Sequence, residues 1–141
     1  METIKELSVV AAIMLAMDAL WLAGNNAYHR QVFAALQGQP LSVRWIPAAA
    51  VYVLMIVGVW FFAVSPTTEW STADATRGNA VITAASRGAF LGAVMYGLYD
   101  LTNYATLVHY PLRYMLTDMA WGIFLCAVVA GGARWILNNV I

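Results

Sequence analysis

Charged residues are scarce in this chain, and the few that are present balance one another. Of 141 residues, 10% are charged, with seven basic and seven acidic side chains and a net charge of zero. Soluble domains carry about 25% charged residues. Because no basic cluster is present, we expect no nucleic-acid partner. The chain is also short, so we expect a single domain that comprises residues 1–141.

Several chemical signatures are missing as well. Cys126 is the only cysteine and lies within the last apolar run, which excludes an internal disulfide framework and a cysteine metal cluster. We interpret it as an ordinary packed residue. The chain has no serine or cysteine nucleophile motif, no HExxH motif and no glycine-rich nucleotide loop. These absences make an enzyme less expected and leave any cofactor unassigned.

Apolar residues, in contrast, are abundant. They make up 62% of the chain, and the mean hydropathy is +0.71. A soluble domain of this size has too little interior for so much apolar surface. Four runs approach the roughly 20 residues that a helix needs to cross a bilayer; they comprise residues 7–24, 45–64, 88–108 and 114–136. We therefore predict an all-α integral membrane protein, a bundle of four transmembrane helices in the lipid bilayer.

The links between these runs differ in character. Residues 28–36 have apolar side chains at helical spacing with a basic edge, which predicts either a continuation of the first helix or a short interfacial helix. The second link is the most polar segment; a loop is expected at residues 66–69, and residues 74–86 are expected to begin the third helix. The third link, residues 109–113, is so short that the last two helices must form an antiparallel hairpin.

The basic residues are divided between the two sides of this bundle. With four spans, four of them fall on the side of the termini and three on the other: Lys5, Arg77, Arg87 and Arg134 against Arg30, Arg44 and Arg113. By the positive-inside rule, this division favours both termini in the cytoplasm.

Three aspartates interrupt or border the apolar runs. Asp18 lies about six residues before the far end of the first run, Asp100 about eight before the far end of the third, and Asp118 about four after the start of the fourth. At 1.5 Å per residue, all three lie roughly 6–12 Å below the same membrane surface. A carboxylate in hydrocarbon costs several kcal/mol. We therefore expect the three aspartates to share the interior of the bundle.

Other polar and aromatic side chains fall on the same helical faces. Asn103 and Tyr96 flank Asp100 at helical spacing, Asn25 follows Asp18 by two turns, and Tyr114 precedes Asp118 by one turn. Each of two aspartates is also followed three residues later by a tryptophan, in Asp18-Ala-Leu-Trp21 and Asp118-Met-Ala-Trp121. These tryptophans either line the site or belong to the usual interfacial belt. We predict that Asp18, Asp100, Asn103 and Asp118 bind a ligand or ion, and that the following residues line the site: Trp21, Asn25, Tyr96, Tyr114 and Trp121.

No cationic residue lies at the same depth to neutralise the aspartates. Arg113 and His109, on the predicted hairpin, are the nearest candidates. Three carboxylates without a counter-charge cannot all stay ionised in low dielectric, so at least one should be protonated or should hold a cation. Alternatively, protonated aspartate, asparagine and tyrosine side chains form interhelical hydrogen bonds that only stabilise the bundle.

Three strings carry a resemblance to a known family: Met17-Asp18-Ala-Leu-Trp21-Leu, Tyr99-Asp100-Leu-Thr-Asn103-Tyr, and Thr117-Asp118-Met-Ala-Trp121-Gly122. With them, and with the Tyr110-Pro111-Leu112-Arg113 turn, nearly the whole chain resembles the bacterial family of predicted membrane proteins catalogued as DUF2177. The resemblance implies a four-helix protein of the bacterial inner (plasma) membrane. It implies no activity.

Three functions therefore stay open. The first is a small transporter or channel-like protein that binds a proton or a cation at the aspartates; because four helices enclose only a narrow pore, it would work as a homo-oligomer. The second is a membrane enzyme with paired carboxyl groups as acid and base, assisted by His29 or His109, that acts on a lipid or another apolar ligand. The third is a non-catalytic accessory subunit. Small residues at Gly88 and Gly92 predict close packing against neighbouring helices or against a second copy.

Overall fold

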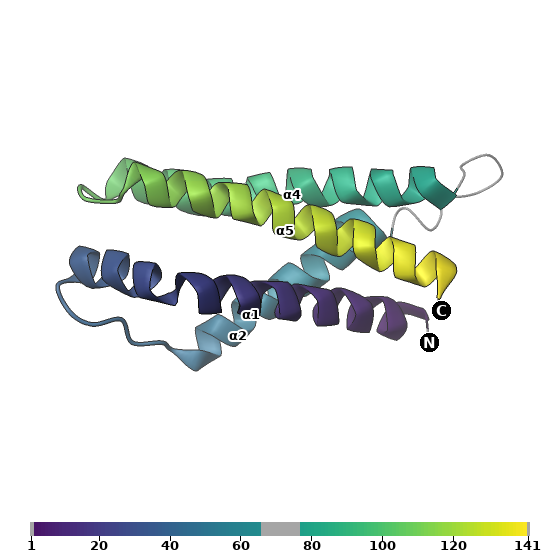
Figure 1. Cartoon of the computed structure of the whole chain (residues 1–141), viewed down its shortest axis with the longest axis horizontal. Helices are drawn as coiled ribbons and strands as arrows, with labels where there is room; N and C mark the ends of the chain where they lie inside the picture. Colours follow the sequence, from purple (N-terminus) through teal and green to yellow (C-terminus); the bar gives the residue numbers. More distant parts are fainter. Residues whose placement is uncertain (1, 66–76, 141) are drawn as a thin grey trace.

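The computed structural model describes residues 2–65 and 77–140. In these residues it has four helices that are long and apolar enough to cross a membrane, which confirms the predicted fold class. They are α1 (Glu2–Gln37), α2 (Trp45–Val59) with its π-helical continuation η1 (Trp60–Val64), α4 (Arg77–Thr106) and α5 (Leu112–Asn139). Both termini lie at one end of the bundle, here the terminal end; the α1–α2 connection and the α4–α5 hairpin lie at the other, here the hairpin end (Figure 1).

Helix α1 is longer than the predicted span of residues 7–24, and the separate short interfacial helix after it does not form. The helix continues through the polar pair Asn25-Asn26 because both side chains bond within it: Asn25 Nδ2 donates to the Trp21 carbonyl at 3.0 Å, and Asn26 Oδ1 accepts from Arg30 Nε at 3.0 Å. It ends at Gly38, whose φ of 70° is the left-handed conformation that glycine favours after a helix.

The other predicted spans are close to the observed helices. The second span matches α2 and η1 together, and the third and fourth spans are extended at one or both ends in α4 and α5. Residues 77–86 are helical, as expected, whereas the predicted loop at residues 66–69 and the predicted helical start at residues 74–76 lie outside the described residues. Pro111 precedes α5 in an extended conformation, and α4 and α5 form the predicted antiparallel hairpin (Figure 1).

Helix α4 packs mainly against α5, through glycines on both helices. A Cβ atom added at Gly88 would lie 2.2 Å from the Cys126 carbonyl oxygen, and one at Gly92 would lie 2.3 Å from the Gly122 carbonyl oxygen. One added at Gly122 would meet the Tyr96 ring at 2.1 Å. The small residues of α4 thus allow contact with the neighbouring helix of the same chain, as the sequence predicted.

The buried residues form two clusters. The larger one is apolar, fills the terminal half and includes Cys126, which is a packed core residue as interpreted. The smaller one lies at the hairpin end and consists of Val32, Tyr110, Tyr114 and Met115. The polar site lies between the hairpin end and the apolar core.

Candidate functional site

Asp18, on α1, is nearly buried and has two neutral donors. Its side chain is 8% exposed. The Tyr52 hydroxyl from α2 donates to Oδ2, and the Trp121 indole from α5 donates to Oδ1 at 3.2 Å. Asp18 thereby joins three helices through its hydrogen bonds.

Asp100, on α4, is fully buried, and only one of its two carboxyl oxygens accepts a hydrogen bond from the described residues. The Tyr110 hydroxyl donates to Oδ1 at 2.7 Å. Burial, together with Asp100, raises the pKa of the Tyr110 phenol, so this group stays protonated and can donate. Oδ2 has no donor within the described part of the chain, but the Asp118 carboxyl group lies within hydrogen-bonding reach of Asp100. Two carboxylates can only accept, so a bond between them requires a proton on one of the two.

Asp118, on α5, connects the other two aspartates. Its carboxyl group lies within hydrogen-bonding reach of Asp100 and within electrostatic range of Asp18. The three aspartates therefore lie in one region as two linked groups, Asp18 with its two donors and the Asp100–Asp118 pair. Of the three, Asp118 alone lines the two spaces described next.

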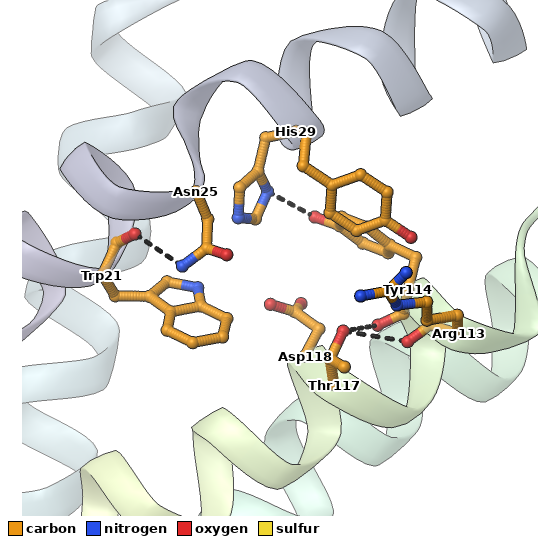
Figure 2. Close-up of a pocket in the computed structure, with 8 residues that line it drawn as sticks. Trp21, Asn25, His29, Arg113, Tyr114, Thr117 and Asp118 are labelled. Atoms are coloured by element: carbon orange, nitrogen blue, oxygen red, sulfur yellow. Dashed lines mark hydrogen bonds between the residues drawn. The ribbon is translucent and has the colours of Figure 1, made fainter.

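The first space is a polar cavity of about 80 Å³ between α1 and α5. Figure 2 shows the Asp118 carboxyl group pointing into it from α5, opposite Asn25 and His29 of α1. His29 Nδ1 is hydrogen-bonded to the Tyr114 hydroxyl at 2.8 Å, and Arg113 lies with its guanidinium carbon 5.8 Å from the centre of the Tyr28 ring. A volume of this size has room for a few water molecules. The lining residues are Trp21, Asn25, Tyr28, His29, Arg113, Tyr114, Thr117 and Asp118.

The two tryptophans, Trp21 of α1 and Trp121 of α5, are partly buried and lie against each other. Their rings are stacked, with centroids 4.5 Å apart and planes 5° from parallel. Trp21 lines the polar cavity, and its buried Nε1 has no acceptor among the described residues. Trp121 contributes the hydrogen bond to Asp18. A buried donor without a partner next to a cavity requires an acceptor there, such as water or a ligand atom.

The second space is an apolar groove of about 470 Å³ between α2 and α4. Asp118 of α5 also lines it. Tyr96, predicted to line the site, lines this groove and not the polar cavity. The residues of the groove are Val51, Leu54, Met55, Met95, Tyr96, Tyr99 and Asp118.

Asn103, like the predicted binding residues Asp18 and Asp100, lines neither space. Its side chain lies within hydrogen-bonding reach of Tyr99, and it stands one turn from Asp100, whose acceptor is instead satisfied by Tyr110. Tyr110 and Tyr52, which hold two of the aspartates, were missed in the sequence. One signal for Tyr52 was available, since it is the only polar side chain between Pro47 and Trp60.

The donors at the site do not form a metal centre. Within residues 2–65 and 77–140, no group of three or more histidine, cysteine, aspartate or glutamate side chains is arranged to hold a metal ion. The arrangement instead offers two neighbouring carboxyl groups, with Asp118 in the lining of both a polar cavity and an apolar groove.

Comparison with known protein families places the chain beside one of predicted membrane proteins. The model of the family described as "Predicted membrane protein (DUF2177)" matches residues 3–135, nearly the whole chain. No curated protein and no solved structure matches the chain. The family description states a location and names no activity.

Proposed function

The chain belongs to the DUF2177 family of predicted membrane proteins, and on that premise we propose that it is a proton-linked transporter that binds and exchanges one proton at the Asp100–Asp118 pair. The observation that carries this proposal is the buried Asp100 Oδ2 atom, which has no donor in the described residues although the Asp100 carboxyl group lies within hydrogen-bonding reach of the Asp118 carboxyl group. A proton shared between the two carboxyl groups satisfies both.

A proton is favoured over a metal cation by the chemistry of the donors. Hard cations require six or more oxygen ligands around one point, whereas the oxygens of Asp18 and one oxygen of Asp100 already accept hydrogen bonds from phenol and indole groups. Those contacts would have to break to admit a metal. A proton is accommodated without rearrangement.

The polar cavity gives the pair a route to the hairpin end. Asp100 is fully buried, whereas Asp118 is only partly buried and points into the cavity (Figure 2). On the other side of the pair, the terminal half of the bundle is filled by apolar side chains with no exposed surface, among them Met14, Val59, Leu125 and Val129. A fixed pore through one protomer would have to cross this core, so transport requires either a rearrangement of the helices or assembly with further copies.

An enzyme is the second candidate, and one observation favours it. The hydrogen-bonded pair of His29 and Tyr114 lines the same small cavity as Asp118. Histidine and carboxyl groups are the usual side chains of general acid–base catalysis. Such an enzyme would use the same shared proton, so evidence for that proton is the first test of both candidates.

Infrared spectroscopy of the protein in lipid tests for the shared proton. We expect a protonated-carboxyl C=O band at neutral pH that shifts on exchange into heavy water. Asp118→Asn and Asp100→Asn should each abolish it, because the introduced amide supplies the hydrogen that the remaining carboxylate needs. Asp18→Asn is the matched control and should leave the band, since Asp18 accepts from Tyr52 and Trp121. A wild-type protein without this band, or one whose band survives both pair variants, would refute the proposal.

A further inference from the structure

Asp118 lines both the polar cavity and the apolar groove. A ligand that occupies both spaces would therefore need a polar part and an apolar part. We infer that the two spaces together bind a single-chain amphipathic amine, with its ammonium group at Asp118 and its hydrocarbon chain in the groove between α2 and α4. This inference rests on the proposed function, because the amine receives the proton of the Asp100–Asp118 pair. It identifies the class of ligand with which that proton is exchanged.

The groove has the position and lining that a hydrocarbon chain requires. Its volume of about 470 Å³ falls within the roughly 300–1,000 Å³ of ligand pockets. Val51 and Leu54 of α2, which are 53% and 72% exposed, form one wall at membrane depth. Toward the terminal end, a hydrogen bond links α4 to η1, the continuation of α2: Arg87 Nε donates to the Phe62 carbonyl at 2.8 Å. Toward the hairpin end, α2 crosses the bundle at an angle and away from α4 (Figure 1). The exposed Val51 and Leu54 side chains leave this wall of the groove accessible from outside the bundle.

The charges around Asp118 favour a cationic headgroup. Three carboxyl groups with one shared proton leave two negative charges in this region, while the cation that lines the cavity, Arg113, is exposed at its mouth and lies against Tyr28. The Asn25 amide nitrogen donates to the Trp21 carbonyl, and the Asn25 amide oxygen is turned toward the cavity (Figure 2). An ammonium group has three donors and no acceptor. It therefore complements Asp118 and Asn25, whereas a carboxylate headgroup would add a further negative charge beside Asp118.

The proton step balances without a further reactant. The neutral amine enters from the lipid, and its nitrogen lone pair forms an N–H bond with the proton of the pair as the carboxyl O–H bond breaks. The products are an ammonium ion and an ionised carboxylate in contact. The donor from Tyr110 stays on Asp100 throughout, and Asp118, at the junction of the two spaces, contacts the new cation.

Three probes that share one hydrocarbon chain and differ in the headgroup distinguish recognition of the headgroup from partitioning into the lipid. Binding of dodecylamine, dodecanol and dodecanoate is measured with the protein in nanodiscs of zwitterionic lipid, after subtraction of binding to empty nanodiscs. We expect the amine to bind about tenfold more tightly than the alcohol, which is the effect of one charge-assisted hydrogen bond, and the carboxylate to bind most weakly. In Asp118→Asn the amine should lose this advantage over the alcohol.

A groove variant tests where the chain lies. Leu54→Trp fills the groove at an exposed position and should weaken binding of amine and alcohol alike, whereas Ile46→Trp, at an 85% exposed position of the same helix that does not line the groove, should not. Equal binding of all three probes, preference for the carboxylate, absence of amine binding, or insensitivity to Leu54→Trp would each overturn the inference. The infrared band is measured without a ligand, so its presence in a protein that binds no amine would refute this inference alone and leave the proposed function intact.

Discussion

The two ends of the bundle both bury acidic groups, but they neutralise them differently. At the terminal end, Glu6 faces Arg134 with Oε1 and Nη2 3.8 Å apart, and it also accepts from Trp60 Nε1 at 2.7 Å. Arg134 Nη2 in turn donates to the Val64 carbonyl of η1 at 2.6 Å. Toward the hairpin end, phenol and indole groups donate to Asp18 and Asp100, and Asp118 has another carboxyl group as its neighbour.

This difference separates a structural charge from one available for exchange. An acid with a fixed cationic partner keeps its charge and holds two elements together, here α1 and α5. An acid with neutral partners can gain a proton or a mobile cation without breaking an ion pair. The position of a counter-charge, rather than the number of acidic residues, therefore distinguishes the two ends.

Removing the cation at the terminal end should produce the largest effect. Arg134→Met removes the guanidinium group that faces Glu6, whose side chain is 13% exposed, and the loss of one partner of a buried pair costs about 3–5 kcal/mol of unfolding free energy. The double variant Glu6→Gln/Arg134→Met removes both charges and should recover most of this loss. Denaturant unfolding in detergent micelles measures both. A double variant no more stable than Arg134→Met would show that the pair does not explain the stability of this end.

Disturbing the packing of α4 against α5 should have the next largest effect on stability, because this interface extends toward both ends of the bundle. Gly92→Ala places a methyl group against the Gly122 backbone at 2.3 Å, and backbone cannot move aside as a flexible side chain can. We expect a loss of about 1–3 kcal/mol, as in other overpacked interiors. Gly97→Ala is the matched control on the same helix, since its nearest atom, Met119 Cε, would be at an ordinary 3.6 Å. Similar melting temperatures for the two variants would contradict close packing at Gly92.

The sequence was sufficient to predict the fold. Apolar runs of membrane length fix the number of spans, and the rise per residue predicts a common depth for Asp18, Asp100 and Asp118 below one membrane surface, which stays a prediction. The first helix continues through residues 28–36, which is one of the two predicted alternatives, because Asn25 and Asn26 bond to their own helix.

The partners of each aspartate could not be predicted in the same way. They depend on how far each helix is rotated about its axis and where the helices cross, and hydropathy records neither. Asn103 shares a face with Asp100, yet Tyr110 from the hairpin donates to that aspartate. Tyr52 reaches Asp18 because α2 crosses α1 at that level. That the predicted binding residues bind a ligand or ion is a proposal, which the experiments above test.

The smallest effect concerns the hydrogen bond between the hairpin and the carboxyl pair. Tyr110→Phe removes the 2.7 Å donor to Asp100 without changing the ring and should cost about 1 kcal/mol. Tyr104→Phe, at a half-exposed position near the same end of α4, is the control and should be close to neutral.

The pH dependence of the same variant identifies the cause of its effect. Burial, and secondarily Asp100, raise the pKa of Tyr110 in the folded protein above the ordinary value of about 10. In the unfolded chain the phenol ionises near that value, whereas in the folded protein it stays protonated, so the bond contributes fully below about pH 10 and its contribution falls as the pH rises further. Chemical unfolding at a series of pH values should therefore show the deficit of Tyr110→Phe at neutral pH and its decrease above about pH 10. A deficit that is constant across this range would indicate lost packing rather than a lost hydrogen bond to Asp100.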